Sequence, residues 1–317
     1  MMESEKTRAG GADGGGAHTI GAHPIDRALE VNGLKLHYLD WGGDGAGHTL
    51  LLLHGGAAHA HWWDDVAPQL TASARVLALD FRGHGQSQWA IPPRYGPRAY
   101  VEDLSVFIQK LGPPVILAGH SMGGAVAQWT TVMFPQLIEA LVIIDAPHGA
   151  PPLWRRLMWR WRRRARSRTR PELDSARDII RRFRLAPPET YLTADRLERL
   201  AMAGAEQLKN GKWAYRFDPE TRAWRRGDTR LARPDIRKIT APTLIVRGAQ
   251  STLVTAGVAR AMHRRIGGSI LREIPRAYHH VPLDNPGDTA AAIAEFIASM
   301  PARRAANRAE STPSNPS

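Results

Sequence analysis

The serine at the centre of Gly119-His120-Ser121-Met122-Gly123 is the side chain best placed in this sequence to act as a nucleophile. An apolar run with strand composition, Val115–Ala118, leads into it, and residues 124–134 repeat apolar side chains at helical spacing after it. A strand that turns directly into a helix needs glycine two residues before and two residues after the serine, because larger side chains would collide there. The pattern predicts a tight turn that exposes the Ser121 hydroxyl.

A serine hydroxyl is a poor nucleophile at neutral pH, so this turn requires a general base, an acid that orients the base, and an oxyanion hole. The backbone N–H of Met122, directly after the nucleophile, is one expected oxyanion donor. The second is the N–H of Gly56, because His54-Gly55-Gly56 directly follows the apolar run Leu50–Leu53. A simple glycine turn at the end of a strand is the alternative interpretation of these residues.

The base is expected beyond the last apolar run of the chain, Ile270–Ile274, where two consecutive histidines are found. His279 and His280 are both candidates on position alone. Either imidazole could take the serine proton.

Six apolar runs predict the sheet that positions these groups. Except at one place, segments long enough for a helix separate them, which is typical of alternating β and α structure. Because the runs lack polar alternation, we expect a mostly parallel twisted sheet with helices on both faces. A type I′ hairpin at Asn32-Gly33 predicts an antiparallel pair before them. The runs are Leu50–Leu53, Val76–Leu79, Val115–Ala118, Leu141–Ile144, Leu244–Val246 and Ile270–Ile274.

The exception is a separation of about 100 residues between the runs Leu141–Ile144 and Leu244–Val246. We interpret residues 147–238 as an inserted helical cap, rich in Arg and Trp, between two segments of the α/β core, residues 24–146 and 239–300. The N-terminal residues 1–23 and the C-terminal residues 301–317 are rich in Gly, Ala, Ser and Pro. We expect both to be disordered tails.

The composition excludes several chemistries. The chain has 317 residues and 43% hydrophobic content, which is ample for a buried core. It contains no cysteine, so disulfides, thiolate nucleophiles and cysteine-ligated metals are excluded. A cytoplasmic location is the default expectation, because no apolar run approaches the roughly 18 residues of a membrane span and residues 1–23 contain no signal-peptide core.

The positive charge is concentrated in the insert. The chain has 43 Lys and Arg against 30 Asp and Glu, and residues 151–238 alone hold 25 of the former and 11 of the latter. No nucleic-acid-binding motif accompanies this charge, so we expect no nucleic-acid partner. Residues 154–170 place apolar side chains on one helical face among nine Arg. We favour a solvated helix packed on the core over contact with an anionic membrane or guidance of a carboxylate-bearing substrate.

Four motifs, in this order, resemble those of the α/β-hydrolase superfamily and in particular its capped serine esterase-like members. The resemblance covers about residues 27–300. It implies the α/β-hydrolase fold, an insert that roofs the nucleophile, no cofactor, no metal, and a mainly structural role for Asp80 and Arg82. The motifs are His54-Gly55, the stretch Asp80-Phe81-Arg82-Gly83-His84-Gly85-Gln86-Ser87, the pentapeptide around Ser121, and the histidine before Val281-Pro282-Leu283-Asp284-Asn285-Pro286.

The resemblance also identifies His279 as the base, although Tyr278 stands where the family usually has glycine. Tyr278 either crowds the loop or supplies a hydroxyl to the site. The acid departs further from the family pattern. Members of the family generally carry Asp a few residues after the strand that matches residues 243–246, where this sequence has Thr252 or, as a second choice, Gln250.

Some members of the superfamily place the acid at the end of the preceding strand, which here is Asp145. This position keeps the order Ser, acid, His. We therefore select Asp145 as the candidate acid. The alternatives are an Asp that only caps the next turn and a Ser-His dyad without an acid.

Together these residues predict a serine hydrolase that cleaves carboxylic esters of small to medium apolar acids through an acyl-enzyme on Ser121. Hydrolysis of a C–C bond, a lactone or a thioester would use the same residues. Epoxide hydrolases and haloalkane dehalogenases are disfavoured, because they need a carboxylate at the position of Ser121. A ligand-binding homologue without catalytic activity is the alternative from another functional class.

Overall fold

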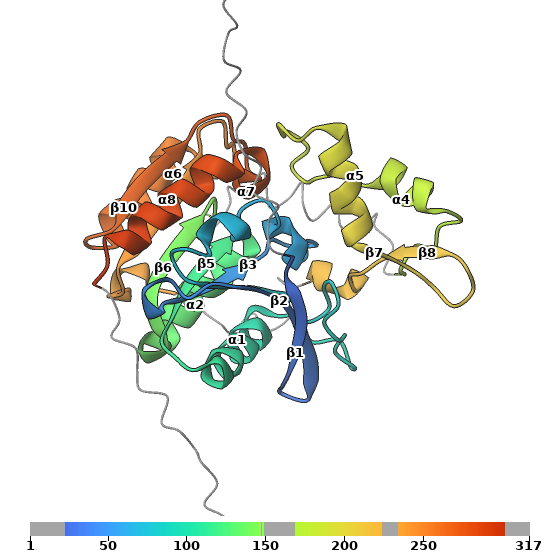
Figure 1. Ribbon diagram of the computed structural model, residues 1–317, viewed down its shortest axis with the longest axis horizontal. Helices are drawn as coiled ribbons and strands as arrows, with labels where there is room; N and C mark the ends of the chain where they lie inside the picture. Colours follow the sequence, from blue (N-terminus) through green and yellow to red (C-terminus); the bar gives the residue numbers. More distant parts are fainter. Residues whose placement is uncertain (1–22, 147, 149–168, 224–233, 302–317) are drawn as a thin grey trace, which may run out of the picture.

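An eight-stranded sheet forms the centre of the protein in a computed structural model that describes residues 23–146, 148, 169–223 and 234–301 (Figure 1). The strand order is β1-β2-β4-β3-β5-β6-β9-β10. The first three strands pair antiparallel and the others parallel, which confirms the predicted mostly parallel sheet. The strands are β1 (Ile25–Val31), β2 (Leu34–Gly42), β3 (Thr49–Leu53), β4 (Arg75–Leu79), β5 (Val115–His120), β6 (Ile138–Ile144), β9 (Thr243–Gly248) and β10 (Ile270–Ile274).

The predicted hairpin joins β1 and β2. Asn32 and Gly33 have φ angles of 51° and 75°, as a type I′ turn requires at both central positions. Val31 pairs with Leu34 across the turn.

The parallel strands are buried on both faces, which explains their uninterrupted apolar sequences. In β3, Leu51 and Leu53 belong to one hydrophobic cluster while Leu50 and Leu52 belong to another, and all four are fully buried. Helices α1 (Pro97–Leu111), α2 (Met122–Met133) and α6 (Ala256–Arg265) contribute to the first cluster. Helix α8 (Pro286–Ala298) contributes to the second, and the short α7 (Val281–Asp284) precedes it.

The alternation of strand and helix is interrupted between β3 and β4. Two short 3-10 helices, Ala60–Trp63 and Ala67–Leu70, replace an α-helix there. The carboxylate of Asp80 accepts a hydrogen bond from the Ala60 N–H at 2.7 Å, and Pro68 removes a backbone donor from the second short helix. These residues pack on the sheet face that α8 also covers.

The insert between β6 and β9 is described for residues 169–223 and 234–238. It contains α4 (Ala176–Arg182), α5 (Ala194–Ala203) and a two-stranded sheet of β7 (Ala205–Gln207) and β8 (Trp213–Tyr215), visible on the right of Figure 1. Apolar side chains of the insert pack on the core around Trp62, where Leu185 and Leu200 meet Leu283.

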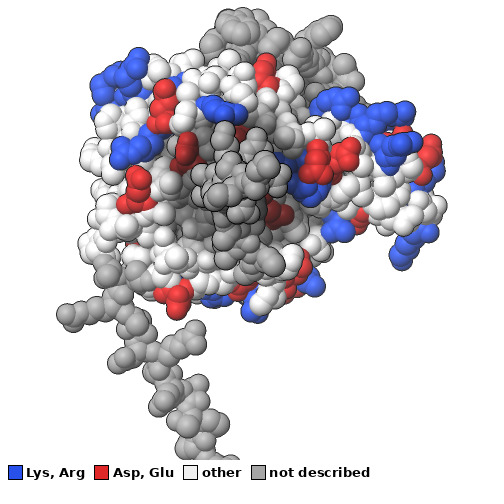
Figure 2. Space-filling model, turned by 45° about the horizontal axis from the view of Figure 1, so that its top comes forward, with Lys and Arg blue, Asp and Glu red and all other residues white. Residues whose placement is uncertain are grey.

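Charges on the described part of the insert are nearly balanced. Residues 169–223 contain 11 basic and 9 acidic side chains. Figure 2 shows Lys and Arg gathered with Asp and Glu on the lobe at its right, and pairs such as Arg181–Asp178 and Lys212–Asp174 join them. The predicted amphipathic segment at residues 154–170 and both predicted tails lie almost entirely outside the described residues. Among the described helices, none has both the length and the apolar content needed to cross a membrane.

Candidate active site

Ser121 lies in the tight turn between β5 and α2 with a φ of 53° and a ψ of −111°. A left-handed backbone at a residue other than glycine is strained, and such strain is typical of functional positions. The helix begins at Met122, two residues earlier than the sequence pattern indicates, with Ser121 directly before its first turn. The two glycines are required by space: a Cβ on Gly119 would lie 2.5 Å from the Gly123 carbonyl carbon, and one on Gly123 would lie 2.5 Å from the Leu53 oxygen.

Ser121, His279 and Asp145 form one chain of hydrogen bonds. The Nε2 atom of His279 lies 3.0 Å from the Ser121 Oγ, and its Nδ1 lies 2.6 Å from the Asp145 Oδ2. Because an ionised carboxylate only accepts hydrogen bonds, His279 carries its proton on Nδ1 and presents the Nε2 lone pair to the serine hydroxyl. The tautomer is the one that a general base needs.

The Asp145 side chain is fully buried, and three donors surround its carboxylate. Besides His279, the Ser251 hydroxyl donates to Oδ2 at 2.7 Å and the Gly248 N–H donates to Oδ1 at 3.3 Å. Burial raises the pKa of this carboxyl to about 7, although the Ser251 and Gly248 hydrogen bonds act in the opposite direction. Burial, together with the neighbouring His280, lowers the pKa of His279 to about 3 and so keeps the imidazole neutral.

The residues in the usual acid position do not reach the imidazole. Thr252 is exposed, and Gln250 binds the backbone of Ala277 through its own N–H and its side-chain oxygen. Ser251, between them, is instead the partner of Asp145. Sequence analysis missed Ser251; its only signal was a hydroxyl in the loop where a carboxylate was sought.

Gly56 and Met122, the residues that carry the two predicted oxyanion donors, are neighbours in space. A Cβ on Gly56 would lie 3.8 Å from Met122 Sδ, and Gly56 lines the same pocket as Ser121. The buried His54 sets the orientation of the preceding peptide, because its Nδ1 donates to the Gly55 carbonyl at 2.7 Å. In a trans peptide the N–H points opposite to the C=O, so the Gly56 N–H points away from His54. The next amide, of Ala57, donates to His84 Nε2 at 3.3 Å.

Asp80 and Arg82 bind other parts of the core. The Asp80 carboxylate binds His37 Nδ1 at 2.7 Å and the backbone N–H groups of Ala60 and Gln86. Although its burial acts to raise the pKa, the His37 hydrogen bond and neighbouring imidazoles lower the pKa of Asp80 to about 2. Arg82 forms a buried two-point ion pair with Asp103. These contacts agree with the structural role that the resemblance implies.

His280 and Tyr278 flank His279 in sequence, but their side chains contact the insert. His280 Nε2 lies 2.8 Å from the Pro187 carbonyl oxygen, so this nitrogen is not available to Ser121. Tyr278 stacks on Tyr191 with ring centroids 5.1 Å apart and does not line the Ser121 pocket. Tyr278 therefore does not supply a hydroxyl to the Ser121 pocket.

The pocket over Ser121 has a volume of about 90 Å³ and is walled by both core and insert. Trp62 contributes from the core, while Phe183, Arg184, Leu185 and Ala186 contribute from the insert. Apart from Arg184, these side chains are apolar. The imidazoles of His120, His279 and His280 form another wall.

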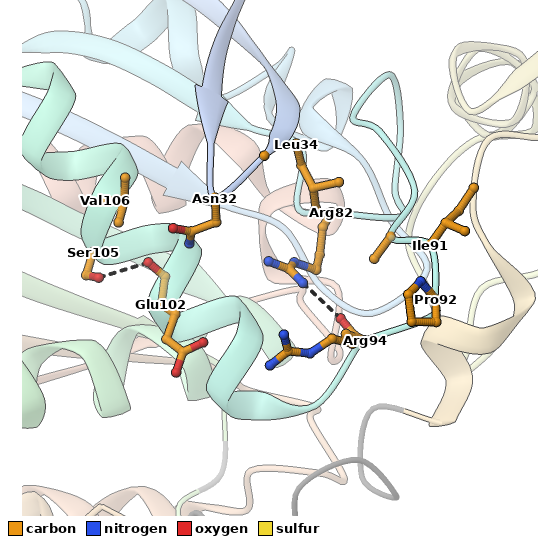
Figure 3. A pocket seen from close by; sticks show the side chains of 11 residues that line it. Asn32, Leu34, Arg82, Ile91, Pro92, Arg94, Glu102, Ser105 and Val106 are labelled. Carbon is orange, nitrogen blue, oxygen red and sulfur yellow. Dashed lines mark hydrogen bonds between the residues drawn. The ribbon is translucent and has the colours of Figure 1, made fainter.

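A larger cavity of about 590 Å³ lies beside the β1–β2 hairpin and shares no lining residue with the Ser121 pocket (Figure 3). Its one buried charged group is Arg82, which Asp103 and the Arg94 carbonyl already bind. Figure 3 shows Arg94 and Glu102 among the side chains that line it. Ser105 is the hydroxyl side chain of the lining and donates to the Glu102 carbonyl at 2.9 Å, and no histidine lines this cavity.

Comparison with known proteins assigns the family. Residues 50–292 match the model of the alpha/beta hydrolase family. An esterase of Mycobacterium tuberculosis, Rv0045c, is 30% identical over 76% of this chain and 79% of its own. The 2-hydroxy-6-oxo-6-(2'-aminophenyl)hexa-2,4-dienoic acid hydrolase of Metapseudomonas resinovorans is 26% identical over 86% of this chain and 91% of its own.

The solved structure of an E-2-(acetamidomethylene)succinate hydrolase superposes with a TM-score of 0.75 at 24% identity, covering 87% of this chain and all of that one. This likeness supports the fold. With a family match over most of the chain and hydrolases among its relatives, the chain belongs to the alpha/beta hydrolase family and is a hydrolytic enzyme.

Proposed function

We propose that the protein is a serine hydrolase that cleaves carboxylic esters of small to medium apolar acids. The observation that carries the proposal is the hydrogen-bonded chain from Ser121 through His279 to Asp145, with distances of 3.0 and 2.6 Å. The esterase relative from Mycobacterium tuberculosis supports an ester as the bond that is cleaved.

In the proposed mechanism, the Ser121 Oγ attacks the ester carbonyl while His279 Nε2 accepts the hydroxyl proton. The imidazolium is stabilised by Asp145, which holds the Nδ1–H. The oxyanion accepts hydrogen bonds from the N–H groups of Gly56 and Met122, and the N-terminal end of α2 adds its dipole. The His279 proton passes to the leaving alcohol, which departs and leaves acyl-Ser121. A water molecule, deprotonated by His279, then attacks the acyl carbonyl, and the proton passes from His279 to the Ser121 Oγ as the acid departs.

The proposed substrate class follows from the pocket walls. Trp62, Phe183 and Leu185 are the apolar surface beside the nucleophile, and the pocket volume is about 90 Å³. Apolar walls of this size favour a short acyl group. We assign the insert the role of a cap, because Phe183 to Ala186 line the pocket and the Pro187 carbonyl binds His280.

A fluorophosphonate probe tests the nucleophile. We expect stoichiometric labelling of the wild-type protein and none of Ser121→Ala. Absence of labelling under conditions that mark a control esterase would favour a ligand-binding homologue without catalytic activity.

A series of p-nitrophenyl esters with increasing acyl length tests the substrate class. We expect kcat/KM to be greatest for the short acyl chains and to fall as the chain outgrows the pocket. If the probe labels Ser121 and no ester in the series is turned over, cleavage of a C–C bond, lactone or thioester at the same serine replaces the ester proposal.

A further inference from the structure

Three imidazoles meet beside Ser121, and the proposed mechanism uses only one of them. His120 ends β5, directly before the nucleophile, and His279 and His280 lie in the loop after β10. The ring centroids of His120 and His279 are 4.8 Å apart, and those of His279 and His280 are 5.1 Å apart. All three side chains are buried, with exposed fractions of 2 to 4%.

The hydrogen bonds of these rings fix the positions of their protons. His120 Nε2 lies 2.8 Å from the His279 carbonyl oxygen, and His280 Nε2 lies 2.8 Å from the Pro187 carbonyl oxygen. A carbonyl oxygen can only accept, so each Nε2 carries the proton and each Nδ1 carries a lone pair. Neither Nδ1 has a hydrogen-bond partner in the described parts of the chain.

The Nδ1 atoms of His120 and His280 are both buried and have no donor among the described residues. Burying a hydrogen-bond acceptor without a donor costs free energy. A ligand that accepts electron pairs from both Nδ1 atoms would offset this cost. His279 adds a third lone pair on Nε2, because its Nδ1 proton is held by Asp145.

We propose that His120, His279 and His280 form a binding site for a transition-metal cation of the Zn²⁺ or Cu²⁺ type, and that a cation bound there inhibits the enzyme reversibly. One nitrogen from each ring lies within 4.8 Å of the other two. Tetrahedral Zn²⁺ with Zn–N distances near 2.0–2.1 Å places its ligand nitrogens roughly 3.3 Å apart, so ring movements on the order of 1 Å complete the site.

The groups behind the three rings match those behind metal-binding histidines in general. Such a histidine almost always donates its second N–H to a carboxylate or a backbone carbonyl. Here His279 donates to Asp145, His120 to the His279 carbonyl and His280 to the Pro187 carbonyl. His120 and His280 are thereby held with an Nδ1 lone pair that has no partner among the described residues, whereas His279 Nε2 faces the Ser121 hydroxyl, which a cation would displace.

Inhibition follows from the shared nitrogen. A cation on His279 Nε2 occupies the lone pair that would take the Ser121 proton. Cu²⁺ is expected to bind more tightly than Ni²⁺ or Zn²⁺, whereas Mg²⁺ and Ca²⁺ prefer oxygen ligands and should not bind. The inference concerns binding, and it holds whether or not the substrate is an ester.

Calorimetric titration of ZnCl₂ into Ser121→Ala tests the site without any hydrolysis. We expect one tight site per chain, reversed by EDTA, and no heat from MgCl₂. In that background, His120→Gln and His280→Gln should each weaken Zn²⁺ binding at least about tenfold, because each removes one ligand. His61→Gln is the matched control: His61 is partly exposed, binds Asp64, and should leave the Zn²⁺ affinity unchanged.

The position of the cation can also be observed without substitution. Wild-type crystals soaked in ZnCl₂ should give an anomalous peak between the three rings, even if the glutamine variants do not fold. No binding at millimolar Zn²⁺, equal affinity in both variants and the control, or a peak only elsewhere would overturn the inference. Wild-type turnover of an activated ester should then fall with Zn²⁺ and recover with EDTA.

Discussion

Replacing Asp145 with Asn tests the acid of the proposed site. Loss of a triad acid can lower kcat by up to ~10⁴, which corresponds to about 5.5 kcal/mol of transition-state stabilisation. We expect Asp145→Asn to approach this limit, because the carboxylate is fully buried and binds the imidazole at 2.6 Å.

The surroundings of residue 145 explain the size of the expected loss. In the asparagine variant the amide oxygen should remain with the Gly248 N–H, which now donates to Oδ1. The amide nitrogen then replaces Oδ2 and faces His279 Nδ1. Its N–H forces the imidazole to carry its proton on Nε2, where it cannot accept one from Ser121. If the amide were rotated the other way, its NH₂ group would face the Gly248 N–H, and two hydrogen-bond donors would oppose each other.

The assay is turnover of p-nitrophenyl acetate, normalised to the fraction of Ser121 that a fluorophosphonate labels. Ser251→Ala is the matched control: it removes the 2.7 Å hydrogen bond to Asp145 but keeps the charge, so a loss of only a few fold is expected. Thr252→Asp in the Asp145→Asn background should restore nothing, because Thr252 is exposed. Turnover of Asp145→Asn within about threefold of the wild type would refute the acid role and leave a Ser-His dyad.

Three further predictions concern the elements that support the site. Gly119→Ala should lower the free energy of unfolding by about 1–3 kcal/mol through steric overlap, while Gly267→Ala, in open space, should not; equal melting temperatures would contradict this. Asp80→Asn should lower the free energy of unfolding, measured with urea at pH 7, by about 2 kcal/mol, because the pKa of Asp80 falls from 3.8 to about 2 on folding. The wild type should lose this stabilisation only as the pH drops from 3.8 to about 2. Burial raises the pKa of Asp145 to about 7, so kcat/KM should fall below about pH 7 as a proton enters the Asp145–His279 pair. In Asp145→Asn this decrease in kcat/KM should occur at lower pH. If it occurs at the same pH in the variant, another group takes up the proton.

The central sheet could be predicted from the sequence because burial on both faces leaves a direct trace in composition. Runs such as Leu50–Leu53 contain no polar residue, and the structure shows alternate side chains in two separate clusters. The segment between β3 and β4 could not be predicted in the same way. Its length suits a helix, but the first of its two 3-10 turns begins at Ala60, whose N–H donates to Asp80, a residue distant in sequence.

The site was predictable where one residue depends on its sequence neighbours. The glycines around Ser121 are required by the turn itself, and the space around Gly119 bears this out. The role of Ser251 and the lone pairs of His120 and His280 depend on tertiary hydrogen bonds, to Asp145, His279 and Pro187. No local pattern carries that information.

The geometry of the sheet explains how an acid at the end of β6 can take the place of one after β9. The two strands are parallel neighbours, with Ile144 opposite Val246, so their carboxyl ends lie about 4.8 Å apart. Asp145 then turns with a φ of 44°, which Asp tolerates better than most residues, and its carboxylate meets the Gly248 N–H at the start of the loop that follows β9.

The Asp145 carboxylate therefore reaches His279 beside the loop that follows β9, although it comes from the end of β6. The absence of an acid at Thr252 consequently does not by itself argue for loss of activity. What the loop after β9 must still supply is a donor that holds the Asp145 carboxylate in place, and Ser251 does so at 2.7 Å. If Asp145 serves as the acid and Ser251 only holds its carboxylate, Ser251→Ala should lower kcat far less than Asp145→Asn, since the charge that stabilises the imidazolium remains.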